Sequence, residues 1–414
     1  MLLRDELQAI AMAGIAAASA PAALGHRLPA GVPRGRTIVL GYGKAAAAMA
    51  EVCAARLQGE VTGCVVTRFG HGAREDTGGI RVIEASHPVP DAASLAAGAT
   101  IRELAATARA GDRVIFLASG GGSALLCDPL PGLTLEEKAR INRHLVRSGV
   151  AIAGINCVRR HLSRVKGGRL AAAARAAADD MHSFVISDVV GDDPAVVASG
   201  PSIASPFEPE RAIAVLEASG WPVDDRLAAL IRSGDDADAD APQHPVHVIA
   251  TAATALDAAQ RHAKALGWRV VQIGDACEGD AAATGRAHAA LALEHLARGE
   301  PCLLLSGGEL TVEVRAADGR GGPNLEYLTG LMAALPPQAP IAALACDSDG
   351  VDGSEDNAGG FFDRDTRADA ARCEAALAAN RSYDLFRELG GLVVTGPTRT
   401  NVNDIRIIAV GDKT

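Results

Sequence analysis

The sequence predicts an α/β fold in two domains, and three observations support this. Short runs rich in Val, Ile and Leu alternate with Ala-rich segments of helical length along almost the whole chain, which is typical of parallel sheets wound with helices on both faces. The 414 residues are too many for one compact core. An acidic stretch of small residues, 236–245, interrupts the pattern as a linker or exposed loop would. We therefore expect a larger N-terminal domain over 1–235 and a C-terminal domain over 246–414.

The expected strands are short apolar runs that are bounded by turn residues. In the N-terminal domain they are 37–40, 64–67, 81–84, 113–117 and 184–186. In the C-terminal domain they are 246–250, 269–273, 302–305, 311–314, 341–345 and 405–410. Helices are expected between them over 2–23, 45–57, 92–110, 135–152 and 280–297. Asp91 stands just before one of these helices and is expected to cap it.

Composition and charge exclude several classes of protein. A chain that is 48% hydrophobic and 22% charged folds as a globular protein, not as a disordered one. No apolar run is both long and charge-free enough to cross a bilayer, and Arg4, Asp5 and Glu6 argue against a signal peptide. The net charge of -10 argues against nucleic acid binding. The eight cysteines form no CxxC pair, which indicates reduced thiols. We expect a cytoplasmic enzyme or binding protein.

A glycine-rich turn, Gly41-Tyr42-Gly43-Lys44-Ala45-Ala46, follows the first expected strand and opens a helix. Backbone N–H groups and the helix dipole favour an anion at such a turn. As Gly-x-Gly-x-x-Ala it matches a dinucleotide fingerprint, although the next strand ends at Arg68, where an NAD enzyme would carry an acidic residue. Alternatively, Lys44 is a cation beside a transferred phosphate. A tight turn with a solvated lysine is the structural alternative.

Further glycine turns follow other apolar strands and are interpreted as nucleotide-binding. Three consecutive glycines carry a large entropic cost, so a close backbone approach is expected after strand 113–117. A nest of N–H groups flanked by hydroxyls suits a triphosphate. The nucleotide-binding residues predicted in this way are Ser119, Gly120, Gly121, Gly122, Ser123, Ser306, Gly307, Gly308 and Glu309. The sequence contains no Walker P-loop and no protein-kinase motif set.

Carboxylates follow two other strands. Asp188 and Asp192 come after strand 184–186, and Asp347 and Asp352 come after strand 341–345. Ligands of α/β sheets bind beyond the carboxyl ends of strands, and carboxylates there can hold Mg²⁺ or accept a proton from a hydroxyl. These four residues are the predicted metal ligands, with solvated acidic turns as the alternative.

Basic and polar side chains recur in three other places. Asn156, Arg159, Ser163 and Lys166 are spaced to share one face of a helix ending near residue 167, which suits an anionic ligand or else a solvated basic face. Arg320 stands between glycines, as an arginine that reaches a phosphate requires; the alternative is an exposed turn. His87 fits equally a core or turn histidine and a substrate contact.

Together these segments resemble the class II glycerate kinases, the glycerate 2-kinase family whose C-terminal region is called the MOFRL domain. The matching stretches run in order through nearly the whole chain: 41–45, 87–91, 119–125, 156–168, 187–193, 306–309, 319–326, 347–353 and 395–404. The resemblance implies ATP- and Mg²⁺-dependent phosphorylation of D-glycerate to 2-phosphoglycerate. It also implies a larger, doubly wound Rossmann-like domain, a smaller α/β domain with the MOFRL region at about 300–410, and an active site between them.

The resemblance carries catalytic roles to Lys44, Asp188 and Arg320. Lys44 and Arg320 would stabilise charge on the transferred phosphoryl group, and Asp188 would orient or deprotonate the substrate hydroxyl. The substrate-binding residues expected on this basis are His87, Asn156, Arg159, Lys166 and Asn324, with Arg159 and Lys166 on the carboxylate. One departure is Arg399, where the family is expected to favour glycine in the turn Thr-Gly-Pro-Thr-x-Thr-Asn.

Two other functions stay open beside the kinase. Members of the family have been labelled hydroxypyruvate reductases, and the fingerprint at Gly41 is compatible with an NAD(P)H-dependent enzyme. A dehydrogenase has no evident use for a lysine, three more glycine turns and two acidic strand ends, whereas phosphoryl transfer uses them all. A non-catalytic sensor of sugar acids or nucleotides is the other alternative. The expected partners are ATP and D-glycerate, without nucleic acid or membrane, and a homodimer is left open.

Overall fold

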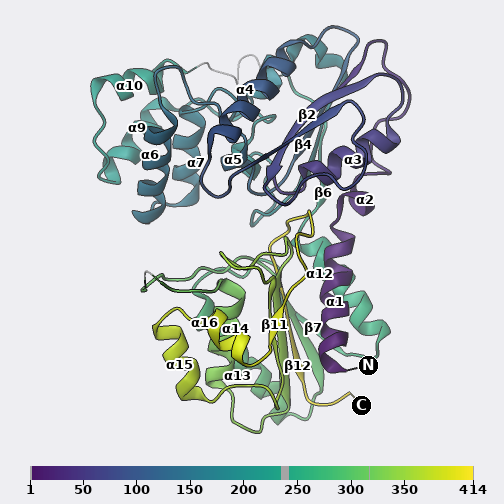
Figure 1. Ribbon diagram of the computed structural model, residues 1–414, viewed down its shortest axis with the longest axis vertical. Helices are drawn as coiled ribbons and strands as arrows, with labels where there is room; N and C mark the ends of the chain where they lie inside the picture. The colour runs from purple at the N-terminus through teal and green to yellow at the C-terminus, as the bar shows by residue number, and fades with distance from the viewer. Residues whose placement is uncertain (1, 235–241, 317, 414) are drawn as a thin grey trace. The chain divides into compact units, whose positions relative to one another are not determined.

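The computed structural model describes residues 2–234, 242–316 and 318–413. The chain splits into two compact units (Figure 1): the N-terminal unit, Ala23–Ile249, and the C-terminal unit, which combines Met1–Ala22 with Ala250–Thr414. The predicted N-terminal domain, 1–235, begins at residue 1, whereas the N-terminal unit begins at Ala23. The prediction ends at residue 235, whereas the unit continues to Ile249. Of the predicted linker 236–245, residues 236–241 lie outside the described residues.

The start of the chain joins the C-terminal unit through helix α1 (Leu3–Ala17). This helix buries Leu7, Ile10 and Ile15 and packs beside α12 (Ala252–Ala265), as Figure 1 shows. A Cβ built on Gly14 would lie 2.8 Å from the Ala255 carbonyl oxygen, so only glycine allows this contact. The predicted single helix over 2–23 is interrupted after Ala17, and α2 (Ala20–Ala23) follows as a separate turn.

The N-terminal unit contains a six-stranded sheet in the order β3-β2-β1-β4-β5-β6. Along this order, each pair of neighbours from β3 through β2, β1 and β4 to β5 is parallel, as predicted. The strands are β1 (Thr37–Tyr42), β2 (Val61–Arg68), β3 (Ile80–Ala85), β4 (Arg113–Ala118), β5 (Met181–Ile186) and β6 (Val246–Ala250). Because β1 and β4 are buried at every residue, they are continuous apolar runs after their first residues, Thr37 and Arg113.

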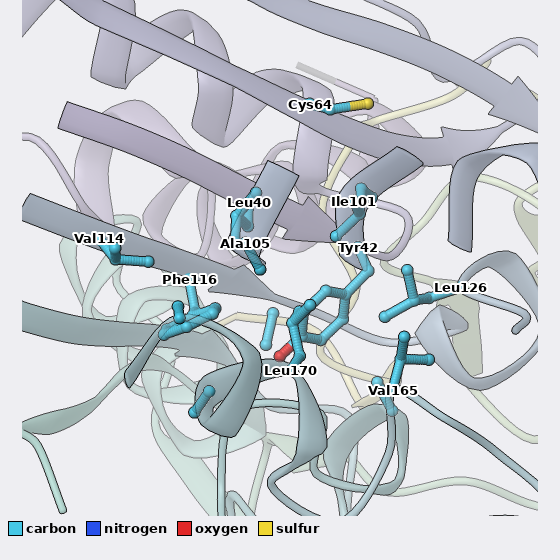
Figure 2. Close-up of a cluster of buried hydrophobic side chains, with 14 of the residues drawn as sticks. Leu40, Tyr42, Cys64, Ile101, Ala105, Val114, Phe116, Leu126, Val165 and Leu170 are labelled. Atoms are coloured by element: carbon cyan, nitrogen blue, oxygen red, sulfur yellow. The ribbon is translucent and has the colours of Figure 1, made fainter. Parts of the chain in front are cut away.

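A hydrophobic cluster joins this sheet to its helices (Figure 2). Tyr42 at the end of β1 lies among Leu126, Val165 and Leu170, which come from segments far along the chain. Its hydroxyl donates to Ser202 Oγ over 3.3 Å, so the buried phenol is satisfied. Helices α3 (Ala46–Arg56) and α4 (Ala92–Ala106) pack on β1 and β2. Asp91 caps α4 as predicted, because its side chain accepts from Ser94 N.

A helical layer of the same unit has its own core. It contains α6 (Leu135–Arg147), α7 (Ile152–His161), α9 (Pro209–Ala218) and α10 (Asp225–Arg232). The predicted helix over 135–152 is wrong beyond Arg147, because Ser148 and the left-handed Gly149 end α6 and a second helix starts at Ile152. Shorter helices complete the unit: α5 (Gly122–Leu125), α8 (Arg169–Ala173), η1 (Arg175–Asp180) and η2 (Val197–Ser199).

The C-terminal unit contains a mixed sheet in the order β11-β10-β9-β12-β8-β7. Its strands are β7 (Val270–Gly274), β8 (Cys302–Ser306), β9 (Ile341–Asp347), β10 (Gly359–Phe362), β11 (Leu392–Val393) and β12 (Asp404–Val410). Only β7 and β8 pair in parallel among these, because the last strand, β12, inserts antiparallel between β8 and β9. The prediction of a parallel sheet is therefore wrong here. It also missed β10 and β11, and the predicted strand 311–314 forms only an isolated bridge at Thr311.

Helices of the C-terminal unit pack closely through small residues. A Cβ built on Gly285 of α13 (Ala281–Ala297) would lie 2.1 Å from the carbonyl oxygen of Tyr327 in α14 (Pro323–Ala334). The remaining helices are α15 (Ala370–Ala378) and α16 (Ser382–Glu388). All eight cysteines are free thiols, as expected. None of the helices in the described ranges is long and apolar enough to span a membrane.

Candidate functional site

Two glycine turns are locked together at the carboxyl ends of the neighbouring strands β1 and β4. Gly43 has a φ of +117°, and a Cβ built on it would lie 2.3 Å from both the carbonyl oxygen and Oγ of Ser119. Lys44 N donates to Gly120 O over 2.9 Å, and Ala45 N donates to Ser119 Oγ over 3.0 Å. Glycine at position 43 is therefore required by the contact between the turns.

Lys44 and His87 both border the second turn. Gly121 adopts a left-handed conformation with a φ of +78°. A Cβ built on it would lie 3.1 Å from the His87 ring and 3.3 Å from Lys44 Cγ. His87 is half-buried, and Lys44 is 9% exposed. The structure thus brings together a cation, an imidazole and the glycine turn, which the sequence placed at three separate strand ends.

The glycine turn presents backbone amides that can bind an anion. In the described part of the chain, the N–H groups of Gly120, Gly121, Gly122 and Ser123 donate to no backbone carbonyl. They precede or begin the short helix α5, whose first N–H groups have no acceptor within the helix. Successive amides of this kind form a nest that favours phosphate oxygens.

A chain of side-chain hydrogen bonds leads from the turn to α7. Ser123 Oγ lies 2.7 Å from Ser199 Oγ, and Ser199 donates to Asn156 Oδ1 over 3.1 Å. Ser199 and Ala198 have positive φ values of +64° and +54°, which non-glycine residues adopt at a cost that tertiary contacts must offset. Nothing in the sequence marks Ser199, since its place depends on this local backbone.

Arg159 is a partly buried cation with neutral partners. Its guanidinium donates to Asn142 Oδ1 over 3.1 Å and to Asn156 Oδ1 over 3.4 Å. Burial lowers the pKa of Arg159. Among the residues that the structure describes, no carboxylate forms an ion pair with it. A desolvated charge without a counter-charge is well suited to an anionic ligand.

Lys166 lies elsewhere than predicted. Helix α7 ends at His161, so Ser163 and Lys166 do not share a helical face with Asn156 and Arg159, and that prediction is wrong. Lys166 is fully buried, and its Nζ donates to Leu126 O and Ala198 O, each over 3.3 Å. Burial lowers its pKa well below the ordinary value, and the nearby Lys138 adds to this effect. In this structure it supports the turn that carries Ser199 and contacts no solvent.

Asp188 follows β5, the neighbour of β4, and therefore lies at the same edge of the sheet as the two glycine turns. It is half-buried. Asp192 is in the following loop with a φ of +55°. No group of three His, Cys, Asp or Glu side chains in the described ranges is close enough to hold a metal ion. One or two carboxylates nevertheless suit Mg²⁺, which is commonly bound through those and through substrate phosphates.

The turn Ser306–Glu309 in the C-terminal unit is held by a buried arginine. Arg406 is 1% exposed, and it donates to Gly307 O over 2.8 Å and to Gly308 O over 3.0 Å. It also forms an ion pair with Asp404. Neither charged residue was predicted as part of a site, although two charges within the apolar run of β12 are a readable signal of a buried pair.

Asn324 and Asp352 form a buried network at the start of α14. Asp352 Oδ1 accepts from Asn324 N over 2.9 Å, and Oδ2 accepts from Leu325 N over 3.0 Å, so this carboxylate caps the helix. Asn324 Nδ2 donates to Asp404 Oδ1 over 2.7 Å, and its Oδ1 is buried without a hydrogen bond. Asp352, a predicted metal ligand, has both oxygens committed to the backbone. Asp347 Oδ1 accepts from Asp349 N over 2.8 Å.

Arg320 has two acidic partners and an aromatic neighbour that were not predicted from the sequence. Its Nε and Nη2 bond to the two carboxylate oxygens of Glu355 at 3.1 and 2.7 Å, and Nη1 lies 3.3 Å from Asp384. The guanidinium carbon lies 4.5 Å from the centre of the Tyr383 ring. The hydrogen bond to Glu355 raises the pKa of Arg320. Such a planar fork cannot be reproduced by lysine.

Arg399 occupies a left-handed position, with a φ of +62°. The family glycine expected there has a conformational reason, and this chain places an arginine in the same backbone region. The surrounding turn packs on the loop after β9, because Thr398 N donates to Asp349 O over 3.0 Å.

Comparisons with known proteins cover nearly the whole chain. A model of a domain of unknown function matches residues 6–232, and the MOFRL family model matches 302–404. A glycerate 2-kinase of Pyrococcus horikoshii is 35% identical, over 92% of this chain and 88% of the relative. A putative hydroxypyruvate reductase of Agrobacterium vitis is 41% identical, over 99% of this chain and 94% of the relative. The crystal structure of a Thermotoga maritima glycerate kinase superposes with a TM-score of 0.84, at 33% identity and 99% coverage of both chains.

The buried carboxyl of Asp352 predicts a pH-dependent stability. Burial raises its pKa from 3.8 to about 7, whereas in the unfolded chain it titrates near 3.8. The folded chain therefore holds more protons between these values, so this carboxyl lowers the free energy of unfolding as pH rises through that window. We expect the urea midpoint of Asp352→Asn, measured relative to that of wild type, to increase between about pH 5 and pH 8. The exposed helix cap Asp369→Asn is the control, and an unchanged or opposite difference would contradict the assignment.

Proposed function

The chain belongs to the class II glycerate kinase family, whose members carry a C-terminal MOFRL domain, and from this premise we propose that it phosphorylates D-glycerate. The donor would be ATP, and the product 2-phosphoglycerate. The observation that carries the proposal is the pair of interlocked turns at β1 and β4, where Lys44 borders an amide nest. Phosphoryl transfer depends mainly on positioning and on neutralising spreading negative charge, and this geometry supplies both.

Each residue around the turns has a separate role in the proposed reaction. We assign the triphosphate to the amides of residues 120–123 and charge neutralisation at the transferred group to Lys44. Asp188, at the same sheet edge, orients or deprotonates the substrate hydroxyl. Arg159 binds the substrate carboxylate, because it is partly buried and its partners are neutral amides. His87 and Asn156 complete the substrate contacts through the turn and the Ser199 hydrogen bond.

Magnesium fits this site through Asp188 and Asp192, which would hold it with one or two carboxylate oxygens, and the ion would neutralise phosphate charge. In the C-terminal unit, we assign a second phosphate contact to the turn Ser306–Glu309. Arg406 binds the carbonyls of Gly307 and Gly308, so these oxygens do not repel an anion. Arg320 presents a planar guanidinium that can exchange a carboxylate for a phosphate oxygen.

Reduction of hydroxypyruvate is the second candidate, because relatives of this chain carry that name. The two reactions are separated by one pair of assays. Purified protein should form ADP from ATP only when D-glycerate and Mg²⁺ are both present, and should not oxidise NADH or NADPH with hydroxypyruvate at a comparable rate. Robust nucleotide oxidation without phosphoglycerate would support the reductase, and binding of both ligands without turnover would support a sensor.

Lys44 is the side chain whose removal tests the site most directly. Lys44→Ala should lower kcat on the order of 100-fold or more, because a charge aimed at the transferred group is lost. Thermal unfolding should change little, since the side chain borders a turn. Lys264→Ala, at an exposed position on α12, is the matched control. A kcat close to wild type would show that Lys44 is only a turn residue.

Substitution of Arg320 tests whether the site needs only a positive charge or also the planar geometry of the guanidinium. Arg320→Lys keeps the charge but loses the paired hydrogen bonds, so we expect a substantial loss, mostly in kcat if the contact strengthens in the transition state. Binding of ATP without glycerate, measured by calorimetry, should persist. Arg315→Lys, whose guanidinium pairs with the exposed Glu313, should behave like wild type. Wild-type turnover of Arg320→Lys would mean that a point charge suffices, and lost ATP binding would place Arg320 in the nucleotide site.

A further inference from the structure

An apolar groove of about 220 Å³ lies between the loop after β3 and helix α6. Pro88, Val89 and Pro90 line it from the loop, and Ala139 and Val146 line it from the helix. Val89 is 44% exposed and Val146 is 61% exposed. Apolar side chains gathered in a solvent-facing groove commonly mark a binding surface.

The rim of the groove is cationic. Arg143 and Arg147 of α6 border it. In the described parts of the chain, neither guanidinium has an acidic partner among the ion pairs. Asn142 also lines the groove, and its Oδ1 accepts from Arg159, so its amide Nδ2 is the group left to donate to a ligand. The combination favours an occupant with a flat apolar body and a negative charge.

The groove adjoins the glycine turn through the residue before Pro88. Pro88 directly follows His87, whose ring would lie 3.1 Å from a Cβ on Gly121. A ligand with phosphates on the turn can therefore extend its other end into the groove.

We propose that this groove binds the purine base of the nucleoside triphosphate, an inference that rests on the nucleotide assignment made above. The proline and valine side chains would cover the faces of the base, and Asn142 Nδ2 would donate to a ring nitrogen. The volume is smaller than that of sites for whole drug-sized ligands, roughly 300–1,000 Å³, as befits one part of a nucleotide. The apolar lining does not suit glycerate, which has only polar groups to offer.

The test removes the apolar walls and leaves the phosphate contacts intact. Val89→Asn and Val146→Asn are made singly and together, and calorimetry measures the Kd of ATP and of inorganic tripolyphosphate, which has no base. In the double variant we expect the Kd of ATP to rise by about tenfold or more, because two apolar contacts with the base are lost. The Kd of tripolyphosphate should stay at the wild-type value.

Val32→Asn is the matched control. Val32 is 59% exposed and precedes β1, at the opposite end of the strand from the turn, so both ligands should bind this variant as they bind wild type. An unchanged Kd of ATP in the double variant would overturn the proposal, as would an equal loss of both ligands or a wild-type chain that binds no ATP. Both valines are exposed, and circular dichroism checks that the variants fold.

Phosphoglycerate formation on the same preparations separates this proposal from the function on which it rests. Base-dependent binding of ATP without any phosphoglycerate would contradict the proposed kinase and support the groove. Normal phosphorylation with an unchanged KM for ATP in the double variant would overturn the groove alone.

Discussion

The contact between Gly43 and Ser119 is the constraint on which the N-terminal site depends. Neighbouring parallel strands end at one edge of a sheet, and here the two turns approach so closely that a Cβ on Gly43 would lie 2.3 Å from Ser119. Glycine at position 43 lets Lys44 N reach Gly120 O, and this bond directs the lysine along the glycine turn. The flexibility of three successive glycines in the unfolded chain is a cost, which the structure offsets with a rigid array of amides beside a cation. A methyl group at position 43 would separate the two turns and disrupt the array of amides.

In the C-terminal unit a buried charge has the corresponding role. Arg406 lies between the carbonyls of Gly307 and Gly308 and the carboxylate of Asp404, and a buried cation needs all of these partners to offset its desolvation. Asp404 in turn accepts a hydrogen bond from the side chain of Asn324. The same side chain donates to Asp352, the carboxylate that caps the start of α14. The glycine turn, the helix start and the last strand thus form one network. In such a network a change at one member is expected to alter the others.

The sequence predicts most of this edge-of-sheet geometry because parallel strands obey a topological rule. Lys44, the glycine turn and Asp188 each follow an apolar strand, and adjacent strands bring them to one edge. The predictions failed where contacts between distant segments determine the local structure. Helix α7 ends at His161, six residues before the glycine that was expected to end it, because Ser163 pairs with Pro129 and Val165 enters the core. The run 311–314 alternates like a strand, but among the described residues only Thr311 has a bridge partner. Ser199 was missed because its left-handed backbone leaves no sequence pattern.

The match of residues 41–46 to a dinucleotide fingerprint is explained by packing. In that fingerprint the second glycine lets the backbone approach a pyrophosphate. Here the space beside Gly43 is already filled by the carbonyl and hydroxyl oxygens of Ser119, at 2.3 Å from where a Cβ would lie. The backbone beside Gly43 is therefore already packed against Ser119. Among the described residues, amides that donate to no backbone carbonyl belong instead to the next turn, 120–123, and the Lys44 side chain borders that turn. β2 ends at Arg68, where a carboxylate would be needed to hold a ribose hydroxyl. The glycine pattern that this turn shares with dinucleotide-binding enzymes is thus accounted for by the contact between Gly43 and Ser119.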